Sequence, residues 1–289
     1  MNSTLLGQLI ISGISSSFIL LLTSLGLVII MGYMKVVNLA HTSMLMVGAY
    51  LCYFLYQEAH IPFVLTLIIA YLISFAVGAV MERTIICHFY GKMAETLLAT
   101  YAISIILNQL ALILFGKEYR QVSYPIKQVL EFGPFHIEAY RLIICVIAIC
   151  ALAATVLFIN KTSMGRKIRS TTQNRGMTEC LGIDTQKVDT ITFSHGMGLA
   201  GLAGAAIAPL STVTYSLGDS WLTNTFMNVV MGGVSSFAGT IASSFIIQES
   251  VSLISGFFDS VTAQIVVLIF VILVVRLKPE GLFSVKERR

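Results

Sequence analysis

Long, nearly uninterrupted apolar blocks constrain this chain more than any other feature of its sequence. Of its 289 residues, 56% are hydrophobic and only 11% are charged. About 20 apolar residues carry a helix across a bilayer, and lipid cannot satisfy the backbone of an open strand. We therefore predict one all-α, polytopic transmembrane domain over residues 1–289. Its eight or nine helical crossings are expected near residues 5–32, 43–56, 61–81, 94–116, 139–160, 188–213, 222–236, 238–257 and 262–277.

Two of these blocks, 43–56 and 222–236, are shorter than the others. At a rise of 1.5 Å per residue, neither covers the full hydrocarbon thickness as a straight helix. Each is therefore expected to be either a full crossing or a half-helix or re-entrant segment. This choice sets the number of crossings, and hence the side of the N-terminus.

Basic residues gather in two stretches of the chain. Residues 161–175 hold five bases and no acid, and residues 276–289 hold five bases and two acids. The positive-inside rule predicts that both stretches, including the C-terminus, are cytoplasmic, and that the charge-balanced 117–138 connection is external. With nine crossings the N-terminus is then external. The bases flank apolar spans without interleaved aromatic residues, which indicates contact with lipid headgroups and no nucleic-acid partner.

A polar segment, TTQNRGMTECLGIDT, occupies residues 171–185 between two apolar blocks. The spacing predicts a helix of about three turns that Thr171 or Thr172 caps and Gly182 ends. Its small or apolar face is Gln173, Gly176, Met177, Cys180 and Leu181, and its polar face is Asn174, Arg175, Thr178 and Glu179. From the residues alone, two interpretations stay open: a helix that lies on the membrane surface, or a docking helix for a cytoplasmic partner.

Several motifs of catalysis and energy conversion are missing from the sequence. There is no G-x-x-x-x-G-K-[ST] loop, so we expect no ATP site in this chain. Neither HExxH, GxSxG nor a pair of carboxylates within one apolar block occurs, and the five cysteines have no metal-type spacing. We therefore expect this chain to have no enzymatic activity, cofactor or metal of its own.

Polar side chains inside the apolar blocks are candidates for lining a transport pathway. Amide groups suit a small neutral solute that needs hydrogen-bond donors and acceptors, but they serve equally in hydrogen bonds between helices. An ionisable group in a span is a second kind of candidate, for a structural or a pathway role. The candidates are Asn38, His41, Asn108, Gln109, Asn224, Asn228 and Glu249.

Five stretches of the sequence, in order, resemble permease subunits of ABC importers of the branched-chain amino acid class, most closely the urea and short-chain amide branch. They are MGYMKVVNLAHTSMLMVGAY (31–50), TLLATYAISIILNQ (96–109), TTQNRGMTECLGIDTQKVDTITF (171–193), FMNVVMGGVSSFAGT (226–240) and KPEGLF (278–283). The chain departs from the family at Thr42 and Ser43, where Gly and often an acid are usual. Tyr101 stands where the urea branch commonly has Trp.

The resemblance implies an inner-membrane subunit that works within a larger assembly. It implies a second permease, two cytoplasmic ATPases, an external substrate-binding protein and surrounding lipid as partners, and urea, a short-chain amide or a branched-chain amino acid as substrate. It assigns contact with the ATPase to Gln173, Asn174, Arg175, Met177, Glu179 and Gly182. The alternative from the residues alone is a self-sufficient channel or secondary transporter for a small neutral solute.

Overall fold

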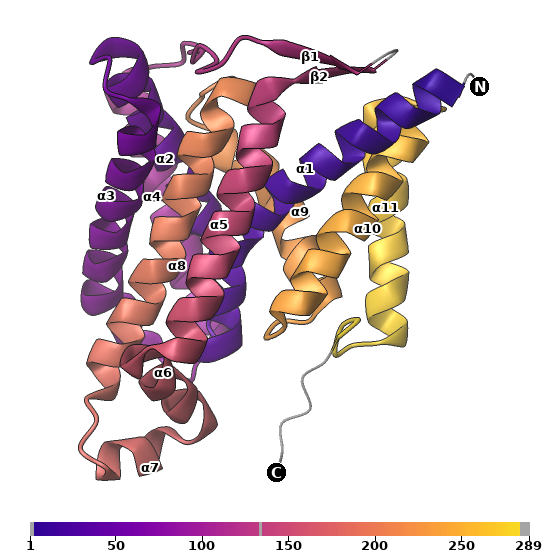
Figure 1. Cartoon of the computed structure of the whole chain (residues 1–289). Coiled ribbons are helices and arrows are strands. Elements are labelled where there is room, and N and C mark those ends of the chain that lie inside the picture. The colour runs from indigo at the N-terminus through magenta and orange to yellow at the C-terminus, as the bar shows by residue number, and fades with distance from the viewer. Residues whose placement is uncertain (1–2, 133–134, 284–289) are drawn as a thin grey trace.

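Seven long apolar helices form the bulk of the molecule, which we describe from a computed structural model covering residues 3–132 and 135–283. Each is long and apolar enough to cross a membrane. They are α1 (Ser3–Ile29, continued by the π-helical turn η1, Ile30–Met34), α3 (Phe63–Thr84), α4 (Met93–Phe115), α5 (Ala139–Lys161), α8 (Thr185–Ile207), α10 (Phe237–Ser255) and α11 (Ser260–Leu277). The expectation of an all-α polytopic bundle is confirmed (Figure 1).

Two short helices, α2 (His41–Cys52, continued by η2, Tyr53–Glu58) and α9 (Leu217–Gly232), complete the bundle. Residues 35–40 and 211–216, which precede them, are not helical. The starts of the two helices meet, because a Cβ atom on Gly218 would lie 2.5 Å from the Thr42 carbonyl oxygen. The blocks 43–56 and 222–236 therefore contain half-helices, which is one of the two alternatives left open for them. The expected count of eight or nine crossings is too high for the described residues, which hold seven helices of spanning length, because these two blocks form the short helices α2 and α9.

The non-helical segment before α2 runs from one end of the bundle to its middle. At the end of the bundle, the carbonyl of Tyr33 accepts a hydrogen bond from Thr172 at 2.9 Å. Eight residues further along the chain, the Nε2 atom of His41 already lies 2.9 Å from the carbonyl oxygen of Thr23. At 1.5 Å per residue, Thr23 is about 16 Å before the end of η1, or roughly half the thickness of a bilayer core. Helix α2 therefore starts at mid-depth.

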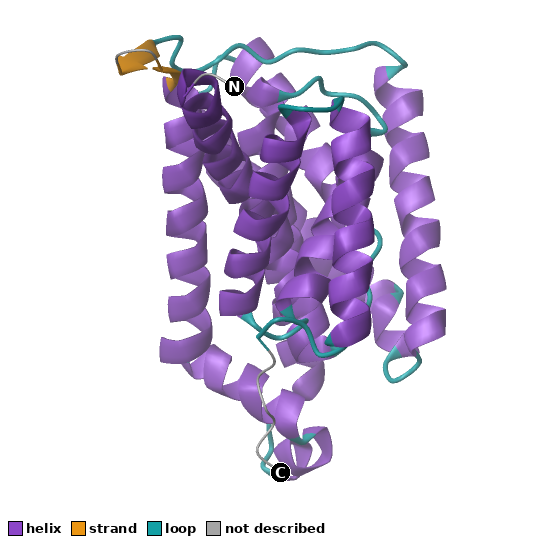
Figure 2. Cartoon of the chain, turned by 90° about the vertical axis from the view of Figure 1, so that its right-hand side faces the viewer, coloured by secondary structure: helices purple, strands orange, loops and turns teal. Residues whose placement is uncertain are grey.

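The connections gather at the two ends of the bundle (Figure 2). At one end lie a β-hairpin of β1 (Val129–Phe132) and β2 (Phe135–Glu138) and the start of α1 (Figure 1). At the other end lie α6 (Ser163–Gln173), α7 (Arg175–Cys180) and the end of α11, with η3 (Ile86–Phe89) between α3 and α4. The connections 117–138 and 161–187 are thus on opposite sides, as the charge pattern predicts.

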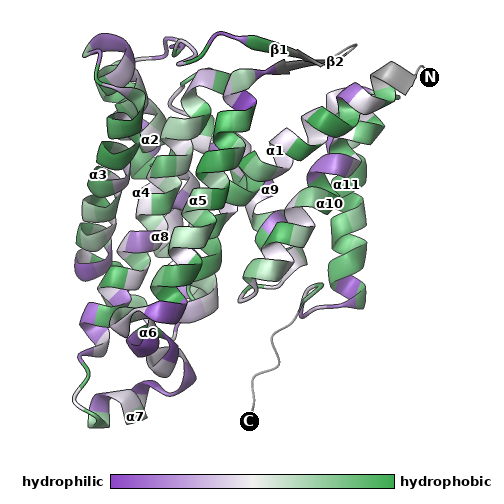
Figure 3. Cartoon of the chain, in the orientation of Figure 1, coloured by the Kyte–Doolittle hydropathy of each residue, from purple (hydrophilic) through white to green (hydrophobic). Residues whose placement is uncertain are grey.

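Helix α8 is the central helix and packs against α1, α2 and α3. Its glycines allow close contact between backbones: a Cβ atom on Gly204 would lie 1.8 Å from the carbonyl oxygen of Leu45 in α2. A Cβ atom on Gly48 of α2 would lie 2.0 Å from the carbonyl oxygen of Gly201. Most residues of the long helices are hydrophobic, and hydrophilic residues gather at the α6 and α7 end (Figure 3).

The prediction of one continuous helix starting at Thr171 or Thr172 is wrong. Both threonines lie in the last turn of α6, and the chain breaks at Asn174, whose backbone is extended (φ −154°, ψ 99°). Asn174 caps α7 instead, since its Oδ1 atom accepts a hydrogen bond from the Met177 amide at 3.0 Å. The prediction for Gly182 is confirmed, because it follows α7 with φ +75°.

Candidate transport site

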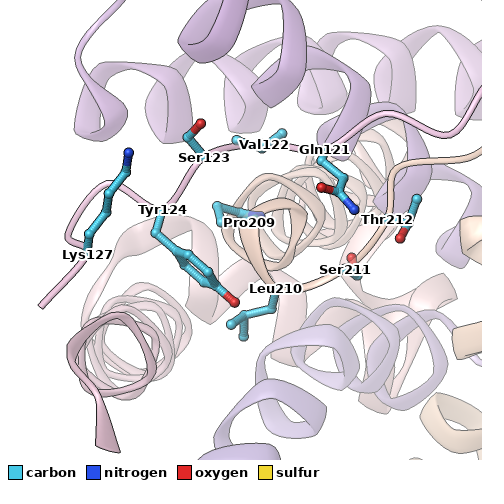
Figure 4. Close-up of a pocket in the computed structure, with 9 residues that line it drawn as sticks. All are labelled: Gln121, Val122, Ser123, Tyr124, Lys127, Pro209, Leu210, Ser211 and Thr212. Atoms are coloured by element: carbon cyan, nitrogen blue, oxygen red, sulfur yellow. The ribbon is translucent and has the colours of Figure 1, made fainter. Parts of the chain in front are cut away.

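A polar hollow opens at the β-hairpin end of the bundle (Figure 4). Its volume is about 430 Å³, and two segments line it: residues 121–127 of the connection before β1, and residues 209–212 after α8. Backbone hydrogen bonds in both directions between Arg120 and Val213, at 3.1 and 2.8 Å, hold the segments together. The Gln121 amide points toward Ser211 and Thr212 (Figure 4). Such a lining offers donors and acceptors to a small polar solute.

A second polar region lies at membrane depth, where α9 begins. The side-chain amide of Asn108 on α4 lies 3.1 Å from both carboxylate oxygens of Asp219. Asp219 is in the first turn of α9, where the helix dipole favours an acid. Asp219, Ser220 and Thr223 are exposed in the isolated chain.

Apolar side chains of α4 surround this polar face, among them Ile105 and Ile113, which are 51% and 75% exposed. A carboxylate that faces lipid costs several kcal/mol, so acids within spans face protein or water. This region therefore fits a surface that another subunit covers or a solute crosses.

Three of the predicted pathway residues, Asn38, His41 and Asn228, are fully buried. Asn228 donates to Ser24 at 2.9 Å and accepts from Ser243 at 2.5 Å, so it joins α9 to α1 and α10. Asn38 contacts the sulfur of Met197 on α8 at 3.2 Å and accepts a hydrogen bond from the Ala40 amide. These contacts suit interhelical hydrogen bonding.

The other predicted pathway residues are dispersed. Glu249 on α10 lies against α1, since a Cβ atom on Gly13 would be 2.6 Å from its carboxylate. Gln109 is exposed and Asn224 is half-buried. Of the seven candidates, Asn108 is the one that contacts the exposed carboxylate of Asp219. Among the described residues, no group of three or more His, Cys, Asp or Glu side chains could hold a metal ion.

Asp219 is the residue that the sequence analysis missed. It falls between the predicted crossings 188–213 and 222–236 and is not among the predicted pathway residues. The available signal was an acid just ahead of a short apolar block, a common start for a helix. This signal would have placed Asp219 in the first turn of a helix, which is where it lies in α9.

The third region is α7, at the basic end of the molecule. Its apolar side chains face outward: Met177 is 61% exposed, Leu181 is 70% exposed, and Cys180 lies between them in the sequence and is also exposed. Two of its polar side chains bind the rest of the chain: Thr178 is buried, and Arg175, although 43% exposed, pairs with Asp189 at 2.7 Å.

Glu179 ties the end of α7 to the start of α8. Its carboxylate accepts a hydrogen bond from Thr185 at 2.6 Å and a longer one from Arg175 at 3.3 Å. These bonds, with Thr185 the larger contributor, lower the pKa of Glu179 below its usual range. Desolvation by the folded chain acts in the opposite direction and is a larger influence on this pKa than the bond from Arg175.

Comparison with protein families identifies the class of molecule. The sequence profile of the branched-chain amino acid transport system permease component matches residues 9–277, nearly the whole chain. The chain belongs to this family. The permease is 23% identical to the high-affinity branched-chain amino acid transport system permease protein LivH of Salmonella typhimurium, over 97% of its own length and 96% of the relative.

Two further relatives cover the permease to a similar extent. It is 25% identical to the probable branched-chain amino acid transport permease protein LivH of Methanocaldococcus jannaschii, over 94% of its length and 91% of the relative. It is 20% identical to the high-affinity branched-chain amino acid transport system permease protein BraD of Pseudomonas aeruginosa, over 97% and 96%. No solved structure matches the chain significantly. The expectation of a multi-pass permease of this class is confirmed.

Proposed function

We propose that this permease is the inner-membrane subunit of an ATP-driven ABC importer, in which it encloses a pathway for a small polar solute together with a second permease. The observation that carries the proposal is the outward apolar side of α7. Met177, Cys180 and Leu181 are uncovered at the basic end of a membrane protein, while Thr178 on the same helix is buried. An apolar patch at a helix tip outside the membrane is a docking surface for a protein partner.

The partners follow from where the three regions lie. Two cytoplasmic ATPases, one for each permease, dock at the α7 end and supply the ATP hydrolysis for which this chain has no sequence motif. The second permease covers the face with Asn108 and Asp219, which lipid cannot cover. An external binding protein delivers the solute to the hollow at the opposite end.

The charges support this orientation. Bases at the α6 and α7 end include Lys161, Arg166, Lys167, Arg169 and Arg276, whereas the hairpin end carries Arg120 and Lys127 beside Glu58 and Glu118. The α7 end and the C-terminus are therefore cytoplasmic and the start of α1 is external. A cysteine introduced at residue 118 should react with an impermeant thiol reagent in intact cells, and protection there would reverse the orientation.

For the solute, two classes have support. The resemblance of residues 96–109 and the amide and hydroxyl groups of the open regions favour urea or a short-chain amide. The names of the relatives favour branched-chain amino acids. Competition by unlabelled urea, acetamide, leucine and valine for ATP-dependent uptake separates the two classes.

Docking at α7 is tested by copurification of the tagged permease with its ATPase. Met177→Glu combined with Leu181→Glu places two charges on the outward face and should reduce the retained ATPase at least tenfold. The matched control, Gln186→Glu, adds an acid at an exposed position of α8 at the same end of the molecule. Retention of the ATPase by the double variant would reject α7 as the docking surface.

A further inference from the structure

One basic residue joins α7 to the transmembrane helices. The Nη1 atom of Arg175 lies 2.7 Å from Oδ2 of Asp189 on α8, whose side chain is only 8% exposed. The same guanidinium lies 5.2 Å from the centre of the Tyr90 ring, just before α4. Its Nε atom also donates to Glu179 within α7.

From Tyr90 and α8 the contacts continue into α3. Glu82, at the end of α3, is fully buried. One of its carboxylate oxygens accepts from the hydroxyl of Tyr90 at 2.5 Å, and the other accepts from Thr190 at 2.6 Å. Asp189 and Thr190 are adjacent residues of α8. Arg175 binds the first of them and Glu82 binds the second.

We propose that Arg175 is a positioning residue that transmits movement of α7 to α8 and to the α3–α4 connection. This proposal rests on the proposed function, because it assumes that an ATPase moves α7. It differs from docking, since the Arg175 guanidinium pairs with Asp189 of the permease's own α8, whereas docking is assigned to the apolar side chains of Met177 and Leu181.

The chemistry of arginine fits this position better than that of lysine. A planar guanidinium can pair with Asp189, donate to Glu179 and lie over the Tyr90 ring at once, whereas an ammonium group is a single compact charge. Without this base, the carboxylate of Asp189 would be left buried and unpaired at the point where α7 meets the bundle.

Helix α8 is suited to carry the movement further. It is about 35 Å long at 1.5 Å per residue, it packs in the centre of the bundle, and it ends just before residues 209–212 of the hollow. Its close backbone contacts at Gly201 and Gly204 make it move together with α2. A displacement of α8 at Asp189 would thus be transmitted from the α7 end of the bundle to the hollow at the opposite end.

A spin label on Cys180 tests the connection in the permease alone, in lipid nanodiscs, with Cys87, Cys145 and Cys150 replaced by Ala. Arg175→Gln should increase the mobility of the label severalfold. Arg166→Gln, which removes an equal charge from α6, should leave it unchanged, and Arg175→Asp with Asp189→Arg should restore the immobile spectrum. An immobile label in Arg175→Gln would overturn the proposal whether or not an ATPase binds.

Transmission itself is measured in the reconstituted complex as solute transported per ATP hydrolysed. Arg175→Gln should lower this ratio at least tenfold while ATP hydrolysis continues, and the exchanged pair should recover it. A wild-type ratio in Arg175→Gln would overturn the proposal and leave the proposed function intact. Failure of the wild-type permease to retain any ATPase would instead reject the proposed function.

Discussion

At the scale of single residues, α7 is held by a few polar contacts outside the membrane. Thr185 donates to Glu179, and this bond keeps the pKa of Glu179 low. A carboxyl whose pKa is lower in the folded state than in the unfolded state contributes stability above the unfolded value, about 4.3 for Glu. That contribution disappears as the pH falls through the folded-state pKa.

We therefore predict that α7 loosens in acid. The mobility of a spin label on Cys180 should rise as the pH falls from 5 to 3, because protonated Glu179 binds Thr185 and Arg175 less well. Asp189 also faces Arg175, so Glu179→Gln serves as the control for its contribution. In Glu179→Gln, the rise in label mobility between pH 5 and pH 3 should be smaller, because the contribution of Glu179 is absent. An identical rise in the wild type and in Glu179→Gln would contradict the role assigned to Glu179.

At the scale of elements, the glycines of α8 decide how the bundle closes. A side chain at Gly204 would collide with the backbone of Leu45, which cannot rotate away as a side chain can. Gly176, on α7, is also helical but has only the Asn174 side chain nearby, at 3.8 Å from an added Cβ atom. Substituting alanine at Gly204 therefore tests the packing between helices, whereas substituting alanine at Gly176 tests helix propensity alone.

Gly204→Ala should destabilise the permease by about 1–3 kcal/mol, the usual cost of overpacking. Gly176→Ala should leave the stability unchanged or raise it by up to about 1 kcal/mol, because alanine favours the helix. Thermal unfolding in detergent, followed by circular dichroism, measures both. A Gly204→Ala protein as stable as the wild type would mean that α2 and α8 do not pack closely at this point.

At the scale of the whole molecule, the spans could be predicted because the length of an apolar block is a local property of the sequence. The two half-helices could be expected from the short blocks, and the position of Gly182 from its neighbours. The break at Asn174 could not be predicted, because the helical spacing of polar and apolar residues continues through it. An asparagine that caps a helix and an asparagine on the polar face of a helix look the same in the sequence and differ only in their backbone angles.

The pairing of distant residues could not be predicted at this scale. Asp219 joins Asn108, and Arg175 joins Asp189, only because short helices fold back into the bundle. The roles of the predicted pathway and coupling residues remain predictions.

The central claim is that this permease moves solute only as part of an ATP-driven assembly. Uptake of labelled urea and labelled leucine into proteoliposomes tests it most directly, with the permease alone and with the copurified ATPase and second permease. We expect uptake of one of these solutes by the full assembly, with ATP and binding protein, and none by the permease alone. Uptake by the permease alone, at the same rate with and without ATP, would contradict it.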